Sequence, residues 1–110
     1  MAYRHQELAL AGWHKLSLAE QLGNIGSEVS RAREWRDRDQ KVSQEAAWRA
    51  LELFDLTLAD SRWRMRLKEI ARARELLCDA IEGGREYHST LEDLDRYFFY
   101  FAVKAQIEKQ

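Results

Sequence analysis

The sequence has no proline and a single cysteine, Cys78, in 110 residues. One cysteine cannot close a disulfide within the chain, and a zinc site needs several Cys or His side chains together. No apolar run approaches the roughly 18 residues of a membrane-spanning helix. We therefore expect no membrane segment and no metal, and we interpret Cys78 as a small buried hydrophobe.

The sequence also lacks an excess of charge of either sign. Eighteen basic and nineteen acidic residues leave a net charge of -1, so the sequence does not indicate a protein that coats nucleic acid with its whole surface. The first residues, MAYRHQELALAG, contain charges where a secretory signal has its apolar stretch, which favours a cytoplasmic location. With 45% hydrophobic and 11% aromatic residues, the composition is that of one folded domain.

What is present is helical periodicity. Glycines and capping residues mark the ends, and no strand pattern competes. The predicted helices run from a cap at Ser17 to near 38, from a cap at Ser43 to near 58, from 60 or 61 to Glu82, and from 89 or 90 onward. Short connections make successive helices antiparallel. The fold class is therefore all-α: an antiparallel up-down-up-down four-helix bundle over residues 17–110, with residues 1–16 as an N-terminal arm that docks on the bundle or on a neighbour.

Each predicted helix has an apolar stripe that should form the core. In order along the chain, the stripes are Leu18, Leu22, Ile25, Val29 and Ala32; Ala47, Leu51, Phe54 and Leu58; Trp63, Leu67, Ile70, Leu77 and Ile81; and Leu91, Leu94, Phe98, Phe101 and Ala105. The segment WRALELFDLTLAD also resembles the second helix of a tetratricopeptide repeat. The two halves of the chain do not repeat each other, so we prefer the bundle.

Catalytic constellations are scarce. No histidine has a glutamate three positions before it, as a di-iron bundle requires, and no phosphate-binding loop is present. Arg85 and His88 invite comparison with helical ribonucleases of the HEPN type, but their spacing is shorter than the five to seven positions typical of that family. We therefore expect a noncatalytic protein without a cofactor, a metal or a small-molecule substrate, and keep RNA cleavage as a remote alternative.

Two surfaces remain after one core has been filled. The last helix carries a second apolar face, and the first helix carries a strip of small side chains that would let another backbone approach closely, within the bundle or from a second chain. We assign a protein interface to Phe99, Tyr100, Val103, Ile107, Ala19, Gly23, Gly26 and Ser30. The interface would serve a homo-oligomer or a larger protein partner, unless the N-terminal arm folds over it.

Thirteen of the eighteen basic residues are arginine, the side chain best suited to bidentate contacts with phosphate. Interleaved acids favour a self-paired surface, but one cluster is expected to gather at one end of the bundle as an alternative nucleic-acid contact. Its members are Arg31, Arg36, Arg38, Arg62, Arg64, Arg66 and Lys68. Trp35 and Trp63 belong to the same segments and either close the core or stack on bases.

Arg36 and Arg74 project close to the apolar stripes of their helices. A buried guanidinium needs a carboxylate partner, and Asp55 and Glu28 border the apolar faces of their own helices. We therefore predict a buried ion pair between Arg74 and Asp55 or Glu28.

Four segments together resemble a family of small, uncharacterised, all-helical bacterial proteins: LGNIGSEVSRAREW, RALELFDLTLAD, RLKEIARARELLCD and EYHSTLEDLDRYFFYFA. The resemblance implies an association with the reverse transcriptases of diversity-generating retroelements, whose better known accessory protein is a helical bundle that oligomerises and binds the polymerase. That accessory protein is strongly basic, whereas this chain is balanced in charge. The resemblance thus implies an adaptor that docks on a reverse transcriptase, which performs the chemistry, with an RNA- or DNA-binding module as the alternative.

Overall fold

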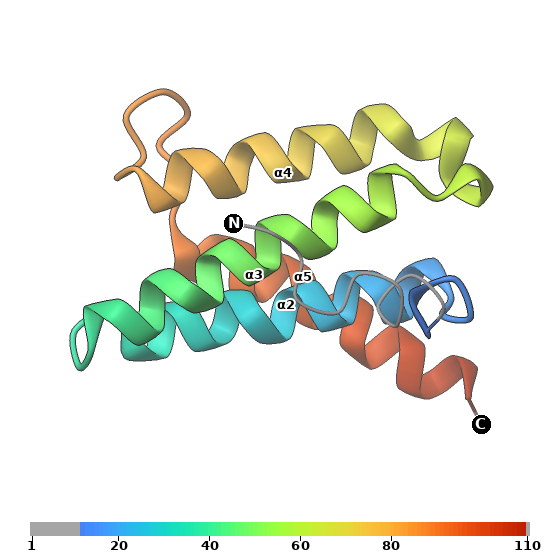
Figure 1. Cartoon of the computed structure of the whole chain (residues 1–110), viewed down its shortest axis with the longest axis horizontal. Helices are drawn as coiled ribbons and strands as arrows, with labels where there is room; N and C mark the ends of the chain where they lie inside the picture. The colour runs from blue at the N-terminus through green and yellow to red at the C-terminus, as the bar shows by residue number, and fades with distance from the viewer. Residues whose placement is uncertain (1–11, 110) are drawn as a thin grey trace.

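The computed structural model describes residues 12–109, and within them it contains four long α-helices and no strand. The helices are α2 (Leu18–Trp35), α3 (Gln40–Leu58), α4 (Leu67–Ile81) and α5 (Leu91–Glu108), with a short 3-10 helix, η1 (Ser61–Arg66), before α4. Successive helices run in opposite directions (Figure 1). The predicted all-α, up-down-up-down arrangement is confirmed. None of the helices in this range is both long enough and apolar enough to span a bilayer.

Local capping sets most of the helix boundaries. At α2 the predicted capping box is present, because Ser17 Oγ accepts from the Glu20 backbone N–H at 3.1 Å and Glu20 Oε1 accepts from the Ser17 N–H at 2.9 Å. Thr90 Oγ1 caps α5 by accepting from the Asp93 N–H at 3.1 Å. Gly83 and Gly84 follow α4 with φ values of 102° and 74°, the left-handed geometry that closes helices.

Two predicted boundaries are wrong. Asp39, not Ser43, caps α3, and its Oδ1 accepts from the Lys41 N–H at 3.1 Å. Ser43 is buried inside the first turn, where its hydroxyl donates to the Ala32 carbonyl at 2.6 Å. In the third helix the cap predicted at Asp60 is present, since its Oδ1 accepts from the Arg62 N–H at 3.1 Å, but it starts the 3-10 helix η1. The α-helix begins only at Leu67, because Trp63 (φ -102°, ψ 22°) interrupts helical geometry in η1.

The core is built around α2, which packs along α3 on one side and α5 on the other, while α4 packs on α3 and α5. The predicted stripes of α2 and α5 are buried throughout. In α3, Ala50 is fully buried, whereas Leu51 and Leu58 are only half-buried. In α4, Leu67 is exposed. The predicted stripes of α3 and α4 are therefore only partly buried, because neither helix is packed on two sides along its length as α2 is.

The described part of the N-terminal arm docks on the bundle. Trp13 is buried, and its Nε1–H donates to Thr57 Oγ1 of α3 at 3.0 Å. The rest of the predicted arm, residues 1–11, lies outside the described residues.

Candidate functional site

The α5 patch consists of Phe99, Tyr100, Val103 and Ile107 on the outer face of α5. Their exposed fractions are 67%, 62%, 41% and 65%, so the described chain leaves all four open. The inner face of the same helix is filled, with Phe98 fully buried and its ring 5.7 Å from that of Phe54. The sequence prediction of a second apolar face on this helix agrees with the structure.

Of the two roles predicted for the small side chains of α2, close approach within the bundle or contact with a second chain, the structure shows the first for Gly23 and Gly26. A Cβ on Gly26 would overlap the Cβ of Phe98, and a Cβ on Gly23 would lie 3.2 Å from the Ala102 Cα. Ala19 is buried in the core. These residues let α2 and α5 of one chain approach each other, so assigning Ala19, Gly23 and Gly26 to an interface with a second chain is wrong.

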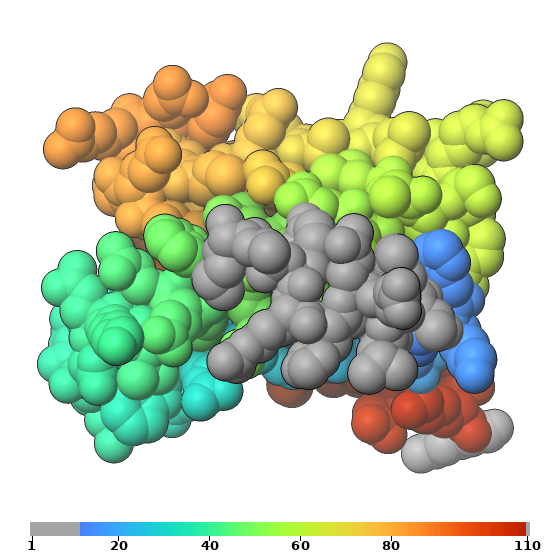
Figure 2. All heavy atoms as spheres, viewed as in Figure 1, coloured from blue at the N-terminus to red at the C-terminus, as the bar shows by residue number. Residues whose placement is uncertain are grey.

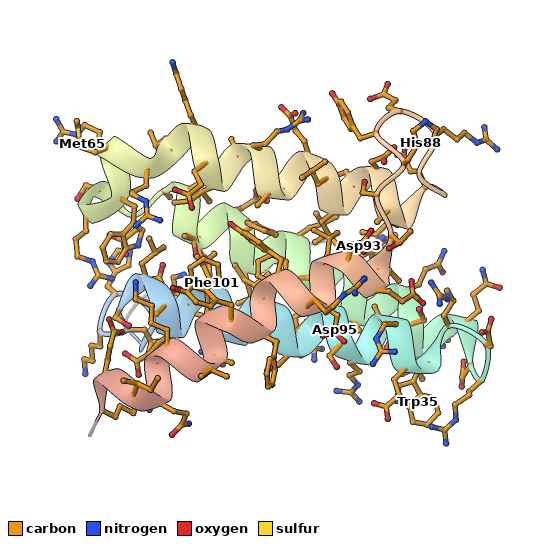
Figure 3. All side chains as sticks on the ribbon, turned by 180° about the vertical axis from the view of Figure 1, so that it is seen from behind. Trp35, Met65, His88, Asp93, Asp95 and Phe101 are labelled. Carbon is orange, nitrogen blue, oxygen red and sulfur yellow. The ribbon has the colours of Figure 1, made fainter. Side chains whose placement is uncertain are left out.

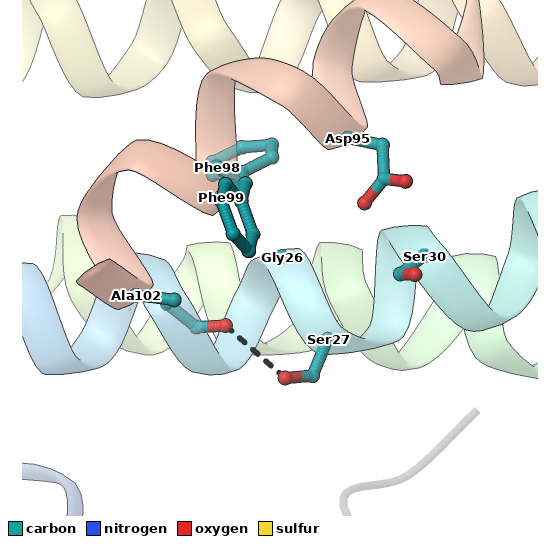
Figure 4. A pocket seen from close by; sticks show the side chains of 8 residues that line it. Gly26, Ser27, Ser30, Asp95, Phe98, Phe99 and Ala102 are labelled. Carbon is teal, nitrogen blue, oxygen red and sulfur yellow. Dashed lines mark hydrogen bonds between the residues drawn. The ribbon is translucent and has the colours of Figure 1, made fainter. Parts of the chain in front are cut away.

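The outer end of the same strip lines a shallow hollow of about 280 Å³ between α2 and α5. Ser27 and Ser30 line it from α2, and Asp95, Phe99 and Ala102 line it from α5 (Figure 4). The hollow therefore places three members of the predicted strip, Gly23, Gly26 and Ser30, beside Phe99 of the α5 patch.

Ion pairs connect α5 to α2 along the edges of their contact. Arg33 Nε lies 2.9 Å from Asp95 Oδ2, and Arg36 forms an ion pair with Glu92. At the opposite end, Lys109 Nζ lies 3.3 Å from Glu20 Oε2. The hydrogen bond from Arg36 lowers the pKa of Glu92, and the Ser17 N–H, with Lys109, lowers that of Glu20. The border of α5 on this side is therefore locally neutralised.

The predicted arginine cluster does not form. In Figure 3, Trp35 and Met65 lie at opposite ends of the bundle, and in Figure 2 the end of α2 (teal) and η1 (yellow-green) occupy opposite ends of the molecule. In an up-down bundle the end of the first helix and the start of the third are one full helix length apart. The expectation of one shared basic patch is therefore wrong.

Most of the predicted cluster has local partners. Arg62 forms an ion pair with Asp60 and donates to the Leu16 carbonyl at 2.9 Å. Arg66 forms an ion pair with Glu69 at 3.0 Å. The Arg38 guanidinium lies 4.5 Å from the centre of the Trp35 ring. The other members, Arg31, Arg64 and Lys68, are exposed. Trp63 is half-buried against the core and donates to Gln21 Oε1 at 2.9 Å, so it closes its end of the bundle.

Arg74 contacts Asp55, one of its two predicted partners, with Nε 3.0 Å from Oδ1. The side chains are 32% and 44% exposed, so the prediction that this pair is buried is wrong. Glu28 instead lies 4.0 Å from Arg49. Cys78 is half-buried beside Arg74, with its Sγ 3.7 Å from Nη1, rather than in the core.

A buried polar network at the α2 start was not predicted. Gln21 is fully buried and donates to the Trp13 carbonyl at 2.9 Å and to Asp60 Oδ2 at 3.2 Å. The hydrogen bonds from Arg62 lower the pKa of Asp60 to about 2, against the effect of burial. The signal in the sequence was a glutamine directly beside Leu22 in an otherwise apolar stripe.

Asp79 organises the loop after α4. Its carboxylate accepts from the N–H groups of Glu86, Tyr87 and Ser89 at 2.8, 3.2 and 3.1 Å, and also from the Ser89 hydroxyl. These bonds, that of the hydroxyl first, lower the pKa of Asp79 to about 2. The loop contains His88, with φ 57°, and Arg85, and both side chains are exposed.

The same loop borders an apolar groove of about 440 Å³ between α4 and α5. Leu76 and Leu94 contribute to its apolar lining, and Tyr87 and Tyr97 line it from the loop and α5. Burial raises the pKa of Tyr97. Within residues 12–109 no three His, Cys, Asp or Glu side chains gather as a metal site would require.

Comparison with known proteins returns no match for this chain among protein-family models, curated proteins or solved structures.

Proposed function

We propose that this protein is a noncatalytic adaptor that works by docking its α5 patch against another protein surface. The support is the exposure of Phe99, Tyr100, Val103 and Ile107 side by side on a helix whose inner face is already packed. Burying apolar area yields about 25 cal/mol per Å², and contiguous apolar patches on soluble proteins commonly mark interaction sites. Burying this patch against another protein would therefore release free energy that folding of the single chain does not.

Other exposed apolar side chains differ in arrangement. Met65 (93% exposed) lies on η1 and Trp48 (51% exposed) on α3, so each stands on a separate element. Single exposed hydrophobes are ordinary on a protein surface. The grouping of four on one helix face distinguishes α5.

The resemblance to proteins found beside retroelement reverse transcriptases suggests the class of complex. In our proposal this chain belongs to a reverse-transcriptase ribonucleoprotein, the polymerase performs the chemistry, and the adaptor contributes protein contacts. The balanced charge of the chain favours protein contact over direct binding of RNA.

The test is affinity capture of the tagged full chain from its native source, with bound proteins and nucleic acids identified before and after nuclease treatment. Tyr100→Glu places a charge in the patch and should remove the specific protein partners. Met65→Glu makes the same change at an exposed apolar site outside the patch and should leave them bound.

Equal capture by Tyr100→Glu and wild type would overturn the docking role of α5. Partners that are retained only through nuclease-sensitive RNA, and lost on combined neutralisation of Arg62, Arg64 and Arg66, would favour the nucleic-acid-binding alternative.

A further inference from the structure

We infer that one end of the bundle, the η1 tip, binds the surface of a membrane that contains anionic lipids. The η1 tip consists of three cations and one apolar side chain: Lys15, Arg64, Met65 and Lys68. The contact is peripheral, since it involves only the headgroup layer and its boundary with the acyl chains. It is also separate from the α5 patch, so it neither requires nor replaces the proposed function.

The η1 tip projects from the bundle. Every residue from 64 to 69 is exposed, and none of the six residues of η1 is buried. A helical turn that lay along the bundle would bury one of its faces. Figure 2 shows η1 (yellow-green) at a corner of the molecule, and Figure 3 shows Met65 at the end of the bundle. A projecting corner of this kind can touch a flat surface without steric hindrance from the helices behind it.

This corner carries positive charge that the neighbouring acids do not cancel. The segment SRWRMRLK, residues 61–68, has four basic and no acidic residues. The acids that flank it are already used, because Asp60 pairs with Arg62 at 2.7 Å and Glu69 pairs with Arg66 at 3.0 Å. The remaining basic side chains of the segment therefore add to its positive charge.

The three cations of the η1 tip have no ion pair among the described residues. Arg64 and Lys68 are exposed in η1 and just after it. Lys15 lies close to them, because the carbonyl of its neighbour Leu16 accepts from Arg62 Nη2 at 2.9 Å. Lys68 is in the first turn of α4, where the helix dipole disfavours a cation, so the stability of α4 does not explain its presence. The three charges favour a partner with negative charge.

Met65 distinguishes between anionic partners. Its side chain is 93% exposed, and Leu67 is 37% exposed. One exposed hydrophobe is ordinary, but this one stands among cations at a projecting corner. At a membrane surface the cations meet lipid phosphates while an apolar side chain enters the acyl boundary below them. A nucleic acid meets only the cations, and three phosphate contacts are few beside the roughly six to ten of typical DNA-binding proteins.

The expected strength of binding follows from these groups. Each Lys or Arg near an anionic leaflet strengthens binding about fivefold, so three cations contribute on the order of a hundredfold. Transfer of the Met65 side chain out of water adds about tenfold. Because the cations are exposed, salt screens their share of the attraction. The contact is therefore reversible and sensitive to ionic strength.

Co-sedimentation of the purified full chain with lipid vesicles tests the inference. Vesicles of phosphatidylcholine are compared with vesicles of equal parts phosphatidylcholine and phosphatidylserine. We expect wild type to bind only the second kind, and to bind it less at high salt. Neutralising two cations of the tip, in Arg64→Gln with Lys68→Gln, should weaken binding about 30-fold. Met65→Gln, which keeps the length of the side chain, should weaken it about tenfold.

Two further variants serve as controls. Arg31→Gln with Lys41→Gln also removes one arginine and one lysine, but from exposed positions at the opposite end of the bundle, and should bind like wild type. Tyr100→Glu disrupts the α5 patch, the other exposed apolar surface, and should also bind like wild type. Circular dichroism melts verify that each variant is folded.

Binding that requires phosphatidylserine, is weakened in the tip variants and is kept in both controls supports the contact. Equal binding to both kinds of vesicle, equal loss in the two neutralised pairs, or loss in Tyr100→Glu overturns it. A wild type that stays in the supernatant also overturns it. If that chain then binds single-stranded RNA through Arg64 and Lys68, as measured by fluorescence anisotropy, the η1 tip is a nucleic-acid contact instead. The capture experiment judges the proposed function separately in every case.

Discussion

At the scale of single residues, buried polar side chains fix the ends of the bundle. Asp79 holds the loop between α4 and α5 through three backbone N–H groups and a hydroxyl. Gln21 connects Trp13, Asp60 and Trp63 at the other end of the molecule. Each donor or acceptor in these clusters would be costly to leave unpaired, so substitutions there should be felt by the whole fold.

Asp79→Asn should make the thermal stability of the fold less dependent on pH in the acidic range. The folded carboxyl has a pKa of about 2, below its ordinary value of 3.8, so its ionised form stabilises the fold above about pH 4 and this contribution is lost as the pH falls toward 2. The variant should have a lower melting temperature near neutral pH, and the difference from wild type should shrink on acidification. Melts followed by circular dichroism across this range provide the measurement; a constant difference would contradict the assignment.

Trp13→Phe tests the docking of the arm. The change keeps an aromatic ring but removes the Nε1–H that reaches Thr57 Oγ1 in a buried site, so the free energy of unfolding should fall by about 1–2 kcal/mol. Urea denaturation measures it. Trp48→Phe is the matched control: Trp48 is 51% exposed, and its replacement should change the free energy by less than about 0.5 kcal/mol.

Arg74→Met distinguishes an exposed ion pair from a buried one. The pair with Asp55 is a third to nearly half exposed, so its loss should cost about 0–1 kcal/mol. A buried pair broken in this way would cost about 3–5 kcal/mol. A urea denaturation result in the larger range would show that this contact is shielded from water in solution.

At the scale of elements, the contact between α2 and α5 depends on glycine. Alanine is the better helix former by about 1 kcal/mol, yet a Cβ on Gly26 would overlap Phe98. Gly26→Ala should therefore destabilise the fold, by about 1–3 kcal/mol, because overpacking outweighs propensity. Ser27→Ala, at the next, exposed position of α2, should be neutral or slightly stabilising. Urea denaturation compares the two, and a more stable Gly26→Ala would show that the helices can separate at little cost.

The elements also show how far periodicity predicts structure. In α2 and α5 the repeat of apolar residues identified the buried face, because both helices are packed along most of their length. It placed the start of the third helix too early, since the composition of SRWRMR does not reveal that Trp63 leaves helical geometry. Ser43 resembled a cap, but the side chain of Asp39 took that role four residues earlier.

At the scale of the whole molecule, α2 is central and α4 is peripheral. An apolar groove of about 440 Å³ separates part of α4 from α5, whereas α2 is covered by both α3 and α5. Amide hydrogen exchange should therefore be slowest in α2, around Ile25 and Val29, and faster in α4. Mass-spectrometric exchange of the full chain measures this order. Equal protection of α2 and α4 would show that the bundle opens only as one unit.

The site was predictable where it depended on one helix and not where it depended on topology. The α5 patch followed from counting apolar residues on both faces of a single helix. The prediction of one arginine cluster was wrong because the C-terminal end of α2 and the start of α4 are separated by the length of α3 (Figure 1). The small residues of α2 could be recognised as a close-approach strip, but sequence alone did not say which backbone approaches.

The contact of α2 with α5 also has a consequence for how the chain folds during its synthesis. The two helices are separated by α3, η1 and α4 along the chain. Gly23 and Gly26 therefore cannot pack against Ala102 and Phe98 until those later residues have been synthesised. Until then the most enclosed helix of the native protein keeps an open apolar flank. A ribosome-bound nascent chain that stops before residue 91 should therefore be recognised by chaperones as incomplete, although it already contains three of the four helices.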